Sequence, residues 1–103
     1  MIAVINVFTV EPANQSRLLD ILSAATEGTV DRAKGFRGAT LHRSLDGTRV
    51  TMRAEWASLD DYEAMRRDPA PLRYFEEALS IAKFDPGLYE VVRRFEPWQD
   101  GAR

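Results

Sequence analysis

The chain opens with an apolar run of the kind found in β-strands. Residues 2–10 are rich in β-branched and aromatic side chains, and the run ends at Glu11-Pro12, which predicts a first strand. Because both faces of this strand are largely apolar, we expect it to be covered on both sides. Asn6 is the polar exception.

Helical spacing follows over residues 13–34. The apolar side chains that share one side of this predicted helix are Leu18, Leu19, Ile21, Leu22 and Ala25. Asn14 or Ser16 is placed to cap its start, and Gly35 to end it after Lys34.

Residues 36–44 and 48–56 predict a β-hairpin, since Asp46-Gly47 between them is a strong turn signal. A three-residue loop with Gly47 in the left-handed conformation pairs His42 with Val50 and Thr40 with Met52. His42, Met52 and Trp56 then share a face. A two-residue turn shifts this pairing by one residue. We favour the first register.

The second half of the chain predicts two helical segments and a strand. Ser58 begins the first with acidic residues in its first turn, and Pro69 and Pro71 interrupt it. A further helix is predicted over residues 72–83, a turn at Asp85-Pro86-Gly87 and a last strand over residues 88–95.

The resulting order, β-α-β-β-α-α-β, predicts an α+β fold of the ferredoxin-like, split βαβ type. We expect a four-stranded, mostly antiparallel sheet with helices on one face. Residues 1–97 form one domain in this interpretation, and residues 98–103 a C-terminal tail.

Composition narrows the possible functions. Of the 103 residues 45% are hydrophobic and 29% charged, with a net charge of −2 and no long run of either sign, which argues against a nucleic-acid partner. The absence of cysteine excludes disulfides, thiolate metal sites and a cysteine nucleophile, and a single histidine excludes a multi-histidine metal site.

The sequence also bears on location. No apolar run approaches the roughly 20 residues of a membrane span, and the N-terminus lacks the pattern of a signal peptide. We therefore expect a cytoplasmic protein with no membrane partner.

Several short motifs together resemble one known family. They are Gly35-Phe36, the hairpin segment from Leu41 to Gly47, the run Glu55-Trp56-Ala57-Ser58, Tyr62 and the break at Asp68-Pro69. In this order and spacing, over residues 1–97, the chain resembles the antibiotic biosynthesis monooxygenase family, and within it the cofactor-free monooxygenases of the actinorhodin-pathway type.

This resemblance implies a dimeric α+β barrel, in which two sheets pack face to face and each subunit holds a pocket between its sheet and its helices. It also implies oxidation of a phenol, anthrone or hydroquinone to a quinone by molecular oxygen, without metal or flavin. The expected partners are a small aromatic substrate, molecular oxygen and a second copy of the chain.

The resemblance implies catalytic roles for Trp56, Tyr62 and His42. Trp56 would pack on the substrate rings, Tyr62 would hydrogen-bond a phenolate or shuttle a proton, and His42 would act as a base or proton relay. Each residue also has a structural interpretation: a core or interface tryptophan, a helix aromatic packed on the sheet, and a solvent-facing histidine.

The implied substrate-binding residues are Asn6, Met52, Arg73 and Phe75. Met52 stands where the actinorhodin-type enzyme has an asparagine, and methionine cannot donate a hydrogen bond. Asn6 would replace that function from the first strand, and Arg73 would stabilise an anionic intermediate.

Other functions stay open. A heme-degrading enzyme of the same superfamily would share Asn6 and Trp56, but it needs an iron-ligating histidine in the second helical region, and residues 69–75 contain none. A non-catalytic binding protein or cyclase-like pathway accessory is a further possibility, as is a quinol monooxygenase outside secondary metabolism.

A sheet with helices on one face leaves its other face to be covered, so we predict a homodimer. Several apolar residues of the predicted strands could face the partner: Val4, Val50, Ala54, Val91 and Phe95.

Overall fold

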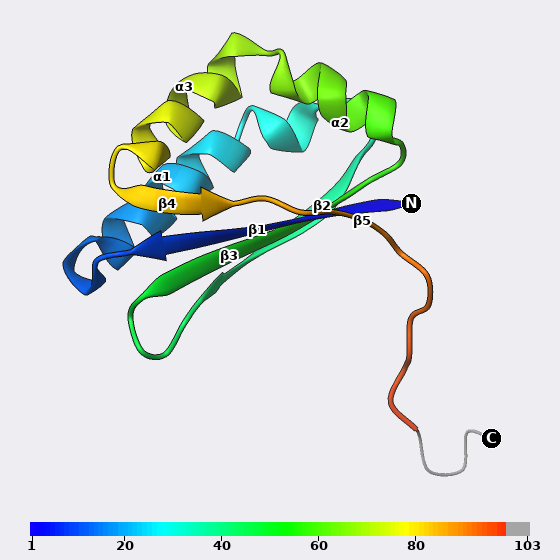
Figure 1. Cartoon of the computed structure of the whole chain (residues 1–103). Coiled ribbons are helices and arrows are strands. Elements are labelled where there is room, and N and C mark those ends of the chain that lie inside the picture. The colour runs from blue at the N-terminus through cyan, green and yellow to red at the C-terminus, as the bar shows by residue number, and fades with distance from the viewer. Residues whose placement is uncertain (99–103) are drawn as a thin grey trace.

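In the computed structural model, which describes residues 1–98, a single sheet carries all the α-helices on one face (Figure 1). In chain order the elements are β1 (Ile2–Val10), the short 3-10 helix η1 (Pro12–Asn14), α1 (Gln15–Thr26), the 3-10 helix η2 (Val30–Arg32), β2 (Phe36–Arg43), β3 (Arg49–Trp56), α2 (Leu59–Arg66), α3 (Pro69–Leu79), β4 (Ala82–Asp85) and β5 (Leu88–Glu90).

The strands lie in the order β2-β3-β1-β4, and every neighbouring pair is antiparallel. β5 pairs with residues 2–4 of β1, while β4 pairs with residues 7–10 of the same strand. Since β3 separates β1 from β2, the first βαβ unit is split. The predicted ferredoxin-like α+β fold is therefore confirmed.

Alternation along the strands divides the sheet into two faces. Phe8, Val50 and Trp56 point toward the helices and are almost wholly buried. Burial of each such side chain stabilises the fold by about 1.5–3 kcal/mol. We call the opposite side, which no helix covers, the open face; it carries Ile5 and Val7, which are partly buried.

The favoured hairpin register is wrong by one residue. His42 pairs with Thr51 and Leu41 with Met52, the shifted pairing of the alternative. The observed loop spans residues 45–48, one residue more than the favoured three-residue loop, because the Ser44 amide donates to the carbonyl of Arg49 at 2.9 Å. It gives the same pairing as a two-residue turn. Gly47 does adopt the left-handed conformation, with φ of 83°. His42 consequently lies on the open face and is exposed.

The first helix is shorter than predicted. α1 ends at Thr26 instead of Lys34, because Gly28 adopts a φ of 81° and its amide donates to the Asp31 carboxylate at 2.9 Å. Asn14 is the N-cap residue but makes no side-chain capping bond. The predicted cap at Ser58 is confirmed, since its hydroxyl accepts a hydrogen bond from the Asp61 amide at 3.2 Å.

The C-terminal boundaries also differ from the prediction. α3 begins at Pro69, behind an Asp68 cap, and ends at Leu79. Ala82 and Lys83, predicted as the end of a helix over residues 72–83, belong instead to the strand β4, which also takes in Asp85 of the predicted turn. The strand predicted over residues 88–95 stops at Glu90. Residues 91–98 leave the sheet as an arm without regular structure (Figure 1), and residues 99–103 of the predicted tail lie outside the described residues.

Val91 and Phe95, two of the apolar residues expected on a strand, belong to this arm. Val4, Val50 and Ala54 lie in the buried core instead of facing a partner. Nowhere in residues 1–98 is there a helix with the length and apolar character needed to span a membrane.

Candidate active site

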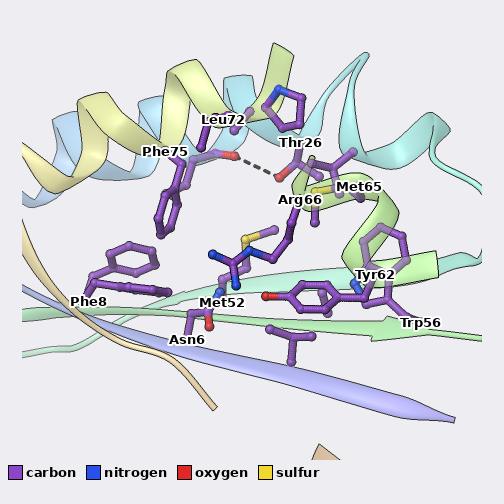
Figure 2. A pocket seen from close by; sticks show the side chains of 17 residues that line it. Asn6, Phe8, Thr26, Met52, Trp56, Tyr62, Met65, Arg66, Leu72 and Phe75 are labelled. Carbon is purple, nitrogen blue, oxygen red and sulfur yellow. Dashed lines mark hydrogen bonds between the residues drawn. The ribbon is translucent and has the colours of Figure 1, made fainter. Parts of the chain in front are cut away.

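The candidate site is a pocket between the sheet and the helices, and it lies where the hydrophobic core divides (Figure 2). Phe8 and Val50 belong to one core cluster, and Val4 and Ala54 to a second. Between these positions Asn6 and Met52 are paired directly across β1 and β3. An amide and a flexible thioether at this point leave a cavity of about 120 Å³.

Aromatic rings close both ends of the pocket. At one end the Phe8 ring lies 5.1 Å from that of Phe84, and the Phe75 ring contacts Phe84 edge to face at 4.7 Å. At the other end the Trp56 ring lies 5.4 Å from Phe36 and 5.9 Å from Tyr62. Such walls favour a flat, apolar ligand.

Polar groups are sparse among the lining side chains. The Thr26 hydroxyl donates to the Leu22 carbonyl at 2.9 Å, so its hydrogen is already used (Figure 2). The side-chain oxygen of Asn6 is buried and has no hydrogen-bond partner within residues 1–98. An unpaired buried acceptor costs about 1–3 kcal/mol, and a ligand that donates a hydrogen bond would offset this.

Tyr62 reaches the pocket because Ser58 sets the start of α2 four residues earlier. The hydroxyl of Ser58 caps the helix through Asp61, and the following turn presents the Tyr62 ring to Trp56. Tyr62 is buried, with only 8% of its surface exposed. Figure 2 shows its hydroxyl pointing into the pocket.

Sequence reasoning missed Arg66, which also lines the pocket. It stands one helical turn after Tyr62, and its guanidinium carbon lies 5.9 Å from the centroid of the Tyr62 ring. Figure 2 shows the side chain reaching from α2 into the pocket. The spacing of four residues from Tyr62 could have identified it, since such residues share a helix face.

Residues 1–77 match a family model described as "Antibiotic biosynthesis monooxygenase". The chain belongs to this family. It is 36% identical over 95 residues to the tetracenomycin-F1 monooxygenase of Streptomyces glaucescens, an alignment that covers 92% of this chain and 85% of that protein. The family and the relative together identify the protein as a monooxygenase-class enzyme.

Solved structures show the same fold at lower identity. SnoaB, described as a cofactor-independent oxygenase from Streptomyces nogalater, superposes with a TM-score of 0.75 at 23% identity, covering 94% of this chain and 97% of SnoaB. Rv0793 from Mycobacterium tuberculosis gives a TM-score of 0.80 at 22% identity, with 92% and 98% covered.

Five of the residues predicted from the resemblance to this monooxygenase family meet in the pocket: Asn6, Met52, Trp56, Tyr62 and Phe75. His42 does not, because the hairpin register turns it to the open face. Arg73 is exposed on α3 and its guanidinium carbon lies 5.6 Å from the Tyr74 ring centroid, outside the pocket lining. The pocket cation is Arg66 instead.

Proposed function

We propose that this protein is a cofactor-independent monooxygenase that oxidises a polyketide-like phenol, anthrone or hydroquinone to a quinone with molecular oxygen. The observation that carries the proposal is the buried oxygen of Asn6, which has no partner among residues 1–98, in a largely apolar, aromatic pocket. A phenolic hydroxyl would supply the missing donor. The 36% identity to a tetracenomycin-F1 monooxygenase supports the same substrate class.

The proposed reaction balances without an added cofactor when the substrate is an anthrone. Loss of a proton from the methylene carbon gives a carbanion, which passes one electron to molecular oxygen. Recombination of the two radicals forms a carbon–oxygen bond. One oxygen atom becomes the new carbonyl, and the other leaves as water with the two hydrogens of the methylene carbon.

The pocket residues would favour this reaction by stabilising the substrate anion and excluding water. In the proposal the Tyr62 hydroxyl donates a hydrogen bond to the phenolate oxygen, and Asn6 holds a neighbouring hydroxyl. Trp56 forms the wall on which the rings pack. Neither a carboxylate nor a histidine lines the pocket within residues 1–98, so the acidity of the substrate itself is central to the proposal.

Oxygen consumption tests this proposal. Purified, metal-stripped protein is mixed with dithranol, an anthrone, and quinone formation is followed by absorbance against a heat-inactivated control. We expect oxygen uptake and quinone formation above the control, unaffected by chelators. Uptake that is lost on chelation and restored by one metal would contradict cofactor independence. Ligand binding without any uptake would favour the non-catalytic alternative.

We also propose that the protein works as a homodimer whose open sheet faces pack together into an α+β barrel. The open face carries Ile5 and Val7, and the arm holds apolar side chains with high exposure: Val92 at 86%, Phe95 at 75% and Trp98 at 60%. A second copy would cover both surfaces. Light scattering at micromolar concentration should give twice the mass of one chain, and a monomer would contradict the proposal.

A further inference from the structure

Arg66 brings a positive charge to a pocket whose other polar lining groups, within residues 1–98, are neutral. No carboxylate in this part of the chain forms a salt bridge with it. By contrast, Arg53 of the sheet and Arg94 of the arm both form ion pairs with Glu55. A guanidinium that borders an apolar cavity without an acidic partner is suited to a ligand with an anionic oxygen.

The position of Arg66 in the helix does not by itself explain why its side chain turns into the pocket. Cations are favoured in the last turn of a helix, and both Arg66 and the C-cap residue Arg67 stand there. Arg67 satisfies the same preference without lining the pocket. Arg66, in contrast, lies near the Tyr62 ring and lines the pocket. The direction of the Arg66 side chain therefore needs a separate explanation.

We propose that Arg66 binds an anionic oxygen of the aromatic substrate, so that the enzyme selects ring systems that carry a carboxylate or an ionised phenol. The inference rests on the proposed function and names its substrate class more narrowly. The anionic group lies on the α2 side of the pocket, next to the Tyr62 hydroxyl, and the apolar rings lie between the two aromatic ends.

The size of the pocket agrees with this placement. A dry cavity of about 150 Å³ binds one benzene ring, and this one measures about 120 Å³. A substrate with several fused rings must extend past the enclosed part toward its solvent-exposed border, where Arg66 and Leu72 lie. A charged substituent there stays partly hydrated and still meets the guanidinium.

The test is equilibrium binding by calorimetry of two probes that share a ring system, 2-naphthoate and its neutral amide 2-naphthamide. In Arg66→Gln we expect the ratio of naphthoate to naphthamide affinity to fall about tenfold, near the lower end of the contribution of a hydrogen bond to a charged group. Arg66→Lys should keep part of the preference. Arg67→Gln is the matched control and should keep all of it.

A second pair of titrations separates the two sources of the anion. 2-Naphthol is measured below and above its own pKa, with the wild type and Arg66→Gln. Tighter binding of the ionised form that depends on Arg66 assigns the site to a phenolate, and dependence seen with naphthoate alone assigns it to a carboxylate. If Arg66→Gln changes the affinity for neither anion relative to its neutral form, the proposal is overturned. Because no turnover is needed, this result is independent of the oxygenase assay.

Discussion

On the helix-covered face of the sheet Phe8, Val50 and Trp56 are almost wholly buried, whereas the open face leaves Thr40 and His42 exposed. The same strands form both faces, and only the alternation of side chains separates them. The covered face is complete within one chain and encloses the pocket. The open face holds fewer apolar side chains and, in our proposal, is completed by a second copy.

The two faces also differ in how their charged side chains are paired. Glu55 on the open face accepts from Arg53 at 2.7 Å and from Arg94 of the arm at 3.2 Å. The hydrogen bond from Arg53, with a smaller contribution from Arg94, holds the pKa of Glu55 below its usual value. Arg53, Glu55 and Arg94 are thus paired with one another on the open face, whereas no carboxylate within residues 1–98 pairs with Arg66 in the pocket.

The largest expected effect is on stability, and neighbouring residues of β1 provide the comparison. Phe8→Ala should lower the free energy of unfolding by about 3–5 kcal/mol, because it opens a cavity in the covered core. Val7→Ala, on the open face, should cost less, and its cost should depend on protein concentration if a partner covers it. Urea unfolding at two concentrations measures both. If Phe8→Ala does not fold, Phe8→Leu gives the same comparison at a smaller scale. Equal losses for the two positions would contradict the assignment of the faces.

The next largest effect concerns catalysis. Tyr62→Phe removes the hydroxyl that points into the pocket and keeps the ring that packs on Trp56. We expect kcat for dithranol oxidation to fall about 10- to 100-fold, with little change in melting temperature. Tyr74→Phe is a suitable control, since Tyr74 packs against the core and does not line the pocket. An unchanged kcat would assign Tyr62 to packing alone.

Substitution of Asn6 should have opposite effects on stability and on activity. Asn6→Leu removes a buried acceptor that has no partner within residues 1–98, so stability should rise by about 1 kcal/mol. Oxygenation should fall, because the substrate hydroxyl loses its partner. Met52→Leu replaces the cross-strand partner of Asn6 by another apolar side chain of similar size. Stability and oxygenation should both stay nearly unchanged. A stability loss in Asn6→Leu would mean that the amide has a structural role.

These contrasts also show what the sequence could and could not predict. The β-branched and aromatic run of β1 and the cap at Ser58 are local signals, and the strand and the cap were both confirmed. The end of α1 has a local cause, the left-handed Gly28 with its bond to Asp31, which the apolar spacing over residues 13–34 did not reveal. The strand β4 depends on longer-range structure. Ala82 continues the apolar spacing of the predicted helix over residues 72–83, but pairing with β1 makes residues 82–85 a strand.

The site followed the same division. Trp56 and Tyr62 come from motifs with fixed spacing, and both line the pocket. Asn6 and Met52 are direct cross-strand partners there, which agrees with the hypothesis that Asn6 takes the place of a polar side chain at position 52. His42 was misplaced by one residue of hairpin register, which reverses the face of every side chain in β2. Arg66 was missed because its importance depends on the direction of a long side chain.

The hairpin loop that sets this register contributes stability that depends on pH. The Asp46 carboxylate accepts from the hydroxyls of Thr48 and Ser44 at 2.7 Å and from the Thr48 amide at 3.0 Å. These bonds lower its pKa from 3.8 to about 2. Their stabilising effect is therefore complete above pH 3.8 and is lost as the pH falls toward 2. Melting temperatures of wild type and Asp46→Asn should converge over this interval, and a constant difference from pH 5 to pH 2 would contradict the assignment.

The smallest effect is expected at His42, and it tests the comparison most directly. His42 lies on the open face opposite Thr51, while the pocket residue Met52 points to the helices. A base on the far side of the sheet cannot reach a substrate bound in the pocket of the same chain. His42→Gln should therefore leave kcat for dithranol and its pH profile within about twofold of wild type, as measured beside Tyr62→Phe in the same assay. A large fall in kcat with an unchanged oligomeric state would return His42 to the catalytic residues and would require a route for protons through the sheet or from a second copy of the chain.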